Sequence, residues 1–317
     1  MAQFTSTRKI RFGVDARTSE GERGTVTDVI VDPATGAAIS VGIRFGVFGH
    51  TTYTSFEHLA SATETEITLD APRSALDLTP PSGVRLTSAT QVALDGKRIG
   101  KLAHITFAHE TRAPLRVVID RGMGAPVAAS AKALSGVDAK TLTLSNEGDG
   151  KDPALTPYHP DSDLREDIRR AIEKYGRMRV DIAGVDVQAV DGVVWLRGHV
   201  SSELNRRLVE DLSRGVDGVA ELHNLLIADS ELAASISSAL ARDPDTAEER
   251  IGIYPALGRV HLRGSVRTAA ARETATRIAA ANPGAREVIN ELRVNPSATV
   301  LSVMAGVTGD EDIVPGD

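Results

Sequence analysis

The sequence predicts a multidomain α+β protein, in which two small all-β barrels precede two α-β-β-α-β units. Two internal repeats carry this prediction. In the C-terminal half, the segment Val193–Val200 returns 66 residues later as Arg259–Val266. In the N-terminal half, a series of short strand patterns returns after about 75 residues. Each repeat indicates one folding unit that has been copied within the chain.

Length and composition fit this organisation. A chain of 317 residues predicts two or three domains. Hydrophobic residues make up 41% but aromatic residues only 3%, so the cores must consist of Val, Ile, Leu and Ala. The absence of cysteine excludes disulfides and thiolate metal sites. Since no run approaches the roughly 20 apolar residues that cross a bilayer, and no apolar segment follows the basic N-terminus, we expect a cytoplasmic protein. Peripheral association of the protein with a membrane surface is the alternative location.

The first 144 residues have the pattern of two consecutive barrels, in copies 1–80 and 81–144. Residues 25–31 are rich in β-branched types, and residues 32–36 contain the Pro and Gly of a tight turn. Many short strands at even spacing are typical of small barrels and sandwiches. In each copy a strand then shows alternating apolar residues, which are Ile39, Val41 and Ile43 in the first and Leu115, Val117 and Ile119 in the second.

Residues 21–29, together with Asp32, Pro33 and Gly36, resemble the PRC-barrel family. Residues 96–102 open a second, more divergent copy that lacks the Asp-Pro turn. This fold is shared by the cytoplasmic part of the photosynthetic reaction-centre H subunit and by a ribosome-maturation protein. The resemblance implies barrels that dock to a partner.

The second copy carries a basic excess. Residues 81–144 hold 9 basic and 4 acidic side chains, a balance of +5 in a chain of net charge −7. The candidate anion-binding residues are Lys97, Arg98, Lys101, Arg112, Arg116 and Arg121. A basic segment attracts phosphates, but Phe107 is its one aromatic residue, so base stacking is not supported. A solvated charged face is the simpler interpretation. His104 and His109 flank a strand end without a third metal ligand and are interpreted as surface histidines.

Residues 145–162 are polar, acidic and interrupted by Gly and Pro, which predicts a linker that lets the barrels move. Domain 163–228 follows, with Asp163 as the expected helix cap. Asp191 and Gly192 predict a tight hairpin. Domain 229–294 begins at once, with Asp229 as the sole spacer, so we expect the two domains to form one rigid body. The acidic tail, 295–317, is expected to be disordered.

Apolar positions at helical spacing predict the buried faces of three helices. They are Leu164, Ile168 and Ile172; Leu204, Leu208 and Leu212; and Leu232, Ile236 and Leu240. In the central strands Val194, Leu196 and Val200, and later Val260, Leu262 and Val266, should point to the core. Gly198 and Gly264 should allow a helix to pack close to the strand, and Asn224 and Asn290 should each tie down a loop.

The C-terminal repeats also resemble a known family. The pattern Val194-x-Leu196-x-Gly198-x-Val200, followed by Gly215, Gly218 and Asn224, is similar to the BON domain, and so is its second copy around Gly264 and Asn290. BON modules occur in osmotic-stress periplasmic proteins, some secretins and mechanosensitive channels, and a cytoplasmic potassium-binding protein. The resemblance implies a non-enzymatic domain that binds phospholipid or other partners.

The open face of the first C-terminal sheet is the expected partner-binding site. Strand parity places Trp195, Arg197, His199, His223, Leu225 and Ile227 on it. An apolar patch of this kind typically marks an interface, and Trp and Arg are frequent anchors. Burial of this face within the chain is the alternative.

We therefore expect a non-catalytic, stress-related bacterial adaptor that binds a protein partner, an ion or a phospholipid surface, without a cofactor or metal. An enzymatic interpretation would recruit His199 and His223, but nothing orders them as nucleophile, base and orienting group. The alternative is a maturation factor in which the basic copy contacts RNA or a ribosomal protein. DNA is not expected as a partner.

Overall fold

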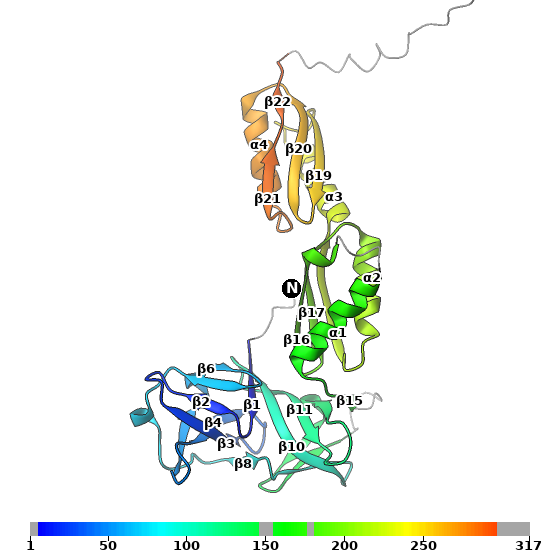
Figure 1. Cartoon of the computed structure of the whole chain (residues 1–317). Helices are drawn as coiled ribbons and strands as arrows, with labels where there is room; N and C mark the ends of the chain where they lie inside the picture. The colour runs from blue at the N-terminus through cyan, green and yellow to red at the C-terminus, as the bar shows by residue number, and fades with distance from the viewer. Residues whose placement is uncertain (1–5, 146–154, 176–180, 297–317) are drawn as a thin grey trace, which may run out of the picture. The chain divides into compact units, whose positions relative to one another are not determined.

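The computed structural model describes residues 6–145, 155–175 and 181–296 (Figure 1). The chain forms two compact units. The first comprises 1–171, 187–195 and 212–223, and the second comprises 172–186, 196–211 and 224–317. Within the described residues, no helix is both long and apolar enough to cross a membrane.

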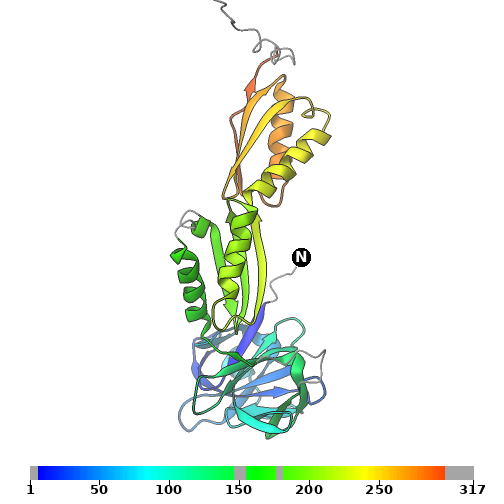
Figure 2. The same ribbon diagram turned by 90° about the vertical axis from the view of Figure 1, so that its right-hand side faces the viewer.

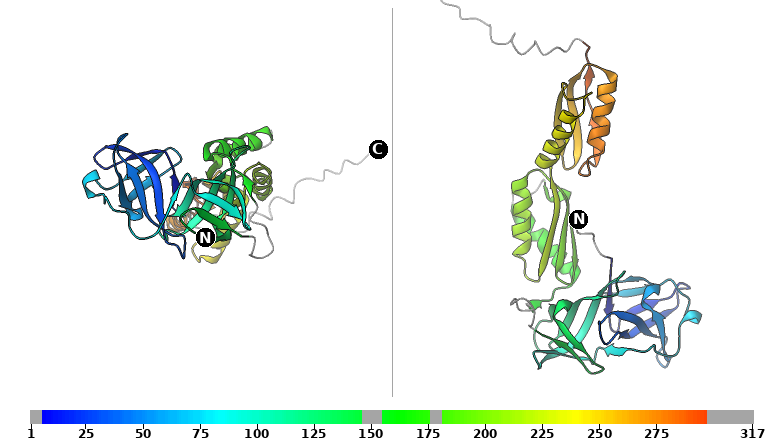
Figure 3. Two further views of the ribbon diagram at one scale, coloured as in Figure 1. Left: turned by 90° about the horizontal axis from the view of Figure 1, so that it is seen from below. Right: turned by 180° about the vertical axis from the view of Figure 1, so that it is seen from behind.

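The N-terminal region consists of strands and short 3-10 helices (Figure 3). The first copy contains β1 (Thr7–Arg11), β2 (Asp15–Arg17), β3 (Arg23–Val31), β4 (Ala38–Arg44), β5 (Thr51–Ser55), η1 (Phe56–His58), β6 (Leu59–Ala62), β7 (Glu66–Leu69) and η2 (Arg73–Ala75). The second contains β8 (Val84–Thr87), β9 (Gln91–Leu94), β10 (Lys97–Ala108), β11 (Pro114–Asp120), β12 (Val127–Ser130), η3 (Ala131–Ala133), β13 (Leu134–Val137) and β14 (Thr141–Leu144).

The two copies exchange their first strands. β1 pairs antiparallel with β10 of the second copy, and β8 pairs antiparallel with β3 of the first. One sheet has the order β5-β4-β3-β2-β7-β6, with β8 attached at β3. The other has the order β13-β14-β9-β10-β11-β12-β15, where β15 is Thr156–Pro157, with β1 attached at β10. The copies also share one hydrophobic core, in which Phe56 meets Phe107 edge-on with ring centroids 5.5 Å apart. The sequence repeat near residue 80 therefore separates two interlocked copies.

Part of the expected linker belongs to this region. β15 (Thr156–Pro157) extends the second sheet by pairing with β12. The Tyr158 amide donates to the carbonyl of Pro126 over 2.9 Å. Of the linker predicted at 145–162, residues 156–157 thus form a strand and 161–162 begin the helix α1 (Asp161–Lys174), while 146–154 lie outside the described residues.

Each C-terminal domain has the predicted α-β-β-α-β order. The first contains α1 (Asp161–Lys174), η5 (Asp181–Gly184), β16 (Val185–Val190), β17 (Val193–Val200), α2 (Glu203–Arg214) and β18 (Glu221–Ala228). The second contains α3 (Asp229–Arg242), β19 (Arg250–Ala256), β20 (Arg259–Val266), α4 (Ala269–Ala280), β21 (Glu287–Asn290) and β22 (Arg293–Val294). The sheet orders are β16-β17-β18 and β19-β20-β21, and β21 and β22 both run parallel to β20 as the crossover rule requires. α3 and α4 cover one face of the second sheet (Figure 2).

The predicted core positions are largely confirmed, with one shifted helix face. The side chains predicted to be buried in α1, α3 and the two central strands are all buried. In α2, however, Leu204 is 74% exposed while Val209 is fully buried. At 100° per residue Leu204 lies about 140° around the helix from Val209, so the two cannot share the core face. α1 also begins at Asp161, two residues before the expected cap at Asp163.

The repeated Asn and Gly residues act differently from the prediction. Asn224 Nδ2 donates to the carbonyl oxygen of Arg206 in α2, and Asn290 Nδ2 donates to that of Arg272 in α4. Each Asn therefore ties its strand to the second helix and not to a loop. At Gly198, where φ is +106°, an added Cβ would overlap the backbone oxygen of Gly184. The close approach at Gly198 is to the last residue of the 3-10 helix η5, and not to α1 or α2.

Candidate functional site

The open face of the first C-terminal sheet centres on an aromatic pair. Trp195 on β17 stacks on His223 on β18, with ring centroids 5.5 Å apart and planes 19° apart. Both side chains are half-buried, as are Arg197 and Leu225 on the same two strands. The alternation of β17, with Val194 and Leu196 in the core, sends these side chains to the opposite face.

The far end of this face is already covered. His199 is 6% exposed, and its Nε2 lies 2.7 Å from the carbonyl oxygen of Gly284 in the second domain. Ile227 packs against the core of the second domain and beside Gly284. The prediction that His199 binds an external partner is therefore corrected, because the ring docks within the chain. Ile227 has the same docking role, and the accessible remainder is Trp195, Arg197, His223 and Leu225.

Three of the six basic candidates gather around one hollow. Arg98, Lys101 and Arg121 line a depression of about 410 Å³ on the second copy, next to the backbone of Gly100 and Gly122. The β10–β11 pairing brings them together, because Lys101 lies opposite Asp120 in that ladder. Lys97 is exposed at the start of β10. These positions leave the basic side chains available to an anion.

The other two candidates face protein groups. Arg112 forms an ion pair with Glu57 over 3.2 Å. Arg116 is 7% exposed and donates to the Thr156 hydroxyl over 3.1 Å. Burial lowers the pKa of Arg116, which the nearby charge of Asp191 opposes. The expectation that Arg116 contacts an external anion is therefore corrected.

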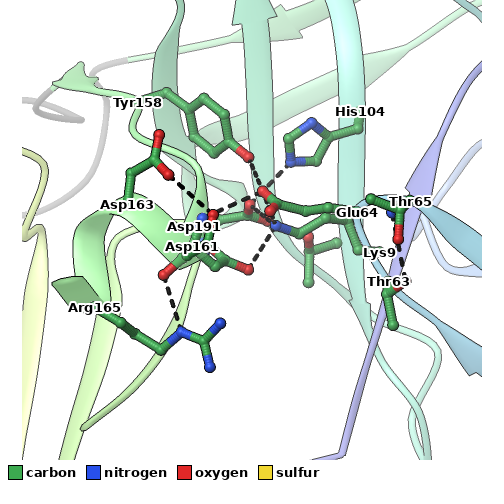
Figure 4. Close-up of polar contacts among 12 residues, drawn as sticks. Lys9, Thr63, Glu64, Thr65, His104, Tyr158, Asp161, Asp163, Arg165 and Asp191 are labelled. Atoms are coloured by element: carbon green, nitrogen blue, oxygen red, sulfur yellow. Dashed lines mark hydrogen bonds and ion pairs between the residues drawn. The ribbon is translucent and has the colours of Figure 1, made fainter.

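A buried ion cluster lies in the first compact unit, where sequence patterns gave no signal. The ammonium of Lys9 on β1 lies 3.1 Å from Glu64, 2.7 Å from Asp161 and 2.7 Å from Asp191 (Figure 4). Lys9 is 3% exposed and Asp191 is fully buried. An ammonium has three donors, so each carboxylate receives one of them. Segments far apart in the sequence meet at this cation.

Histidine and hydroxyl groups complete the cluster. His104 Nε2 donates to Asp191 over 2.9 Å, and the Thr106 hydroxyl donates to the other oxygen of the same carboxylate. The Tyr158 hydroxyl donates to Glu64 over 2.5 Å. His104 is 1% exposed, so its interpretation as a surface histidine was wrong. Strand alternation determines the face on which it lies, but only the tertiary structure brings the Asp191 hairpin onto that face.

Comparison with known proteins addresses the C-terminal half. Residues 160–227 and 228–296 each match the family model of the BON domain. Residues 160–296 are two BON domains. No curated protein matches the chain.

Two solved structures are similar to part of the chain. One is CdsD, a structural protein of the type III secretion system of Chlamydia trachomatis, with 17% identity, a TM-score of 0.35, and coverage of 42% of this chain and 61% of that one. The other is the C-terminal domain of CdsD, also at 17% identity and a TM-score of 0.35, with 42% and 64% coverage. The chain thus spans less than two thirds of either structure.

Both BON domains hold their β-hairpin turn with an acidic residue at the start of the first helix. The Asp229 carboxylate at the start of α3 accepts hydrogen bonds from the amides of Leu257, over 2.6 Å, and Gly258, over 3.0 Å. At the start of α1, Asp161 accepts from the Asp191 amide over 2.8 Å. In each BON domain an acidic residue that opens the first helix therefore holds the β-hairpin turn. Asp191 has a φ of +47° and Gly192 of +87°, which confirms the predicted hairpin.

The cluster sets the protonation of its carboxyls. Burial raises the pKa of Asp191, but His104 and Lys9 together outweigh it and hold this pKa well below its usual range. Burial raises the pKa of Asp161 to about 6; Lys9 opposes this shift and the Asp191 charge adds to it. Of the two, Asp161 therefore takes up a proton first. Lys9 itself stays charged, because the attraction of the carboxylates outweighs burial and raises its pKa.

The carboxylates of this cluster have the spacing of a cation site. Among the described residues, oxygen atoms of Glu64, Asp161 and Asp191 lie within 4.8 Å of one another. The Lys9 ammonium, however, bonds to all three. The set therefore fits an internal cation, and we assign it a structural role.

Proposed function

We propose that the chain is a non-catalytic adaptor whose first BON domain binds a partner protein through the open sheet face. The supporting observation is the half-exposed stack of Trp195 on His223, with Leu225 and Arg197 beside it. Aromatic and Arg side chains contribute most of the binding energy in typical interfaces. The cytoplasmic setting and the stress-related role expected from the sequence remain part of this proposal.

The second BON domain differs at the equivalent positions. His261 stands at the position of Trp195 and lies 3.5 Å from Glu291, which replaces Leu225. Arg263 also binds Glu291, over 2.5 Å. His261 and Arg263 therefore share one carboxylate at these positions, whereas the first domain places the Trp195–His223 stack and Leu225 there. This contrast favours the first domain as the protein-binding module.

The N-terminal copies serve, in this proposal, as a docking module of the PRC-barrel kind. Support comes from the Gly- and Asp-Pro-containing strand pattern at residues 21–36 and from the strand-rich, twofold-repeated structure. A phospholipid surface stays an alternative ligand of the BON domains.

A second candidate function uses the basic hollow. Arg98, Lys101 and Arg121 gather around about 410 Å³ on the second copy, which favours contact with an anion such as the RNA backbone or a ribosomal RNA–protein surface. We expect Lys97→Glu, Arg98→Glu and Lys101→Glu together to weaken RNA binding and to flatten its salt dependence. Unchanged RNA affinity of this triple variant would contradict the second candidate function.

The adaptor function is tested by capture from the native host with the immobilised chain. Leu225→Asp should abolish capture of a partner that the unchanged chain retains, because a buried unpaired carboxylate would stand in the interface. Leu204→Asp is the matched control, since Leu204 is an exposed apolar residue on α2 of the same domain. Capture at low and high salt separates apolar from electrostatic contacts. Equal retention by both variants would contradict the proposal.

A further inference from the structure

A basic hollow lies at one end of the second BON sheet. Its volume is about 730 Å³, and its lining consists of Arg250, Arg263, Gly264, Ser265, Glu291 and Arg293. β19, β20 and β22 bring these residues together, because Arg250 and Arg293 each lie opposite Ser265 in the strand pairing. Three guanidinium groups therefore surround one carboxylate, for a local balance of +2.

The internal repeat shows what this end of a BON domain does. Through the 66-residue repeat, Arg250, Ser265 and Arg293 are equivalent to Gly184, His199 and Ile227 of the first domain. In the first domain these three positions form the docking end: His199 and Ile227 contact Gly284, and Gly184 lies beside Leu257. The same end of the second domain has two arginines and a serine where the first has glycine, histidine and isoleucine. This end of the domain is therefore still positioned to form an interface, but its side chains suit a charged partner and not an apolar one.

We propose that this end of the second BON domain is a docking site for an acidic peptide segment of a partner protein. Arginine presents planar N–H groups that match a carboxylate in two-point hydrogen bonds. The hollow already holds one arginine–carboxylate pair, in which Arg263 Nε donates a single hydrogen bond to Glu291 over 2.5 Å. Successive Glu or Asp side chains of one peptide can each offer a carboxylate to arginines that lie on different strands of the hollow, so an acidic segment fits the site best.

This site is independent of the proposed adaptor surface. The Trp195 face lies on the first BON domain and has an aromatic and apolar character. The arginine hollow lies on the second domain and has an excess of positive charge. Each surface can therefore be removed without the other.

The test measures binding of a fluorescein-labelled octaglutamate peptide to the full chain by fluorescence anisotropy. Arg250→Glu with Arg293→Glu reverses the local balance from +2 to −2. Arg272→Glu with Arg277→Glu is the matched control, because both side chains are exposed on α4 of the same domain and the net charge changes equally. We expect at least about tenfold weaker binding for the hollow variant and less than about twofold for the control. Thermal unfolding verifies that both variants are folded.

Three results would overturn the proposal. They are no measurable binding to the unchanged chain, equal weakening by both double variants, and unchanged affinity of the hollow variant. A competition experiment tests the chemical class. Glutarate should displace the peptide at lower concentration than inorganic phosphate, and the reverse order would assign the hollow to phosphate and contradict the carboxylate proposal.

Discussion

Lys9 provides the sharpest test at the scale of single residues. Its ammonium compensates three carboxylates, one of them fully buried. Removal of one partner from a buried ion pair leaves an uncompensated charge and typically costs about 3–5 kcal/mol. We expect Lys9→Met to lower the free energy of unfolding by about this amount, as measured by urea denaturation.

Arg17→Met is the control for this change. Arg17 pairs with Glu66 over 2.9 Å at the surface, where the side chains are 45% and 36% exposed. Exposed pairs contribute at most about 1 kcal/mol. Equal losses for the two variants would show that the Lys9 cluster is no more important than a surface pair.

Asp161 gives the cluster a defined pH dependence. Its pKa in the folded protein is raised to about 6, above the ordinary value of 3.8. The folded state therefore binds more protons than the unfolded state between these pH values, and stability falls as the pH rises through this window. Relative to Asp161→Asn, we expect the unchanged chain to lose stability between about pH 4 and pH 6. A constant difference across this range would contradict the raised pKa.

The cluster also shows where sequence reasoning stops at this scale. Asp191 was predicted as a turn residue from its Asp-Gly dipeptide, and the turn is confirmed. Its role as the buried acceptor of Lys9 and His104 was not predicted, because the three residues are up to 182 positions apart and share no local pattern. Trp195 and His223, in contrast, were placed on one face by strand alternation, which is a local property.

At the scale of elements, the repeated glycines of the central strands are testable. Gly264 has a φ of +127°, and an added Cβ would overlap the carbonyl oxygen of Arg250. We expect Gly264→Ala to destabilise the second BON domain by about 2–4 kcal/mol, from backbone strain and this clash together. Gly136→Ala is the control, since the nearest atom would lie 3.7 Å away. Thermal unfolding of the two variants should differ clearly, and similar transitions would contradict the backbone constraint.

Periodicity predicted the elements better than their ends. The 3.6-residue and two-residue patterns identified the buried faces of α1, α3, β17 and β20, because side-chain burial imposes those periods. The predicted core face of α2 was wrong. Leu204 begins the i, i+4 series but is exposed, whereas Val209, which lies outside that series, is buried. Pairing of β15 with β12 was missed as well, since a two-residue strand carries no period.

At the scale of the whole molecule, the strand exchange predicts cooperative folding of the N-terminal copies. A fragment of residues 1–80 lacks β8, which pairs with β3, and β10, which pairs with β1. It should therefore not fold as a monomer. A fragment of residues 1–145 retains all four strands and should give a dispersed amide NMR spectrum. A folded monomer of residues 1–80 would contradict the shared core.

The sequence repeats predicted two N-terminal copies but not their interlocking. A repeat reveals that a unit was copied, whereas the choice between pairing within a copy and pairing across copies depends on tertiary geometry. The same limit applies to His199. Strand alternation predicted the face on which it lies, but Gly284, which covers that face, is 85 residues away in the sequence.

The adaptor proposal depends above all on the Trp195 face of the first BON domain. Because Trp195 is the only tryptophan in the sequence, its fluorescence reports this face alone. The decisive measurement is acrylamide quenching of Trp195 before and after addition of the purified captured partner, together with the affinity of Trp195→Ala. We expect the quenching constant to fall on binding and the substitution to weaken binding by about 2 kcal/mol or more. Unchanged quenching in the complex, with full affinity of Trp195→Ala, would show that the partner binds elsewhere.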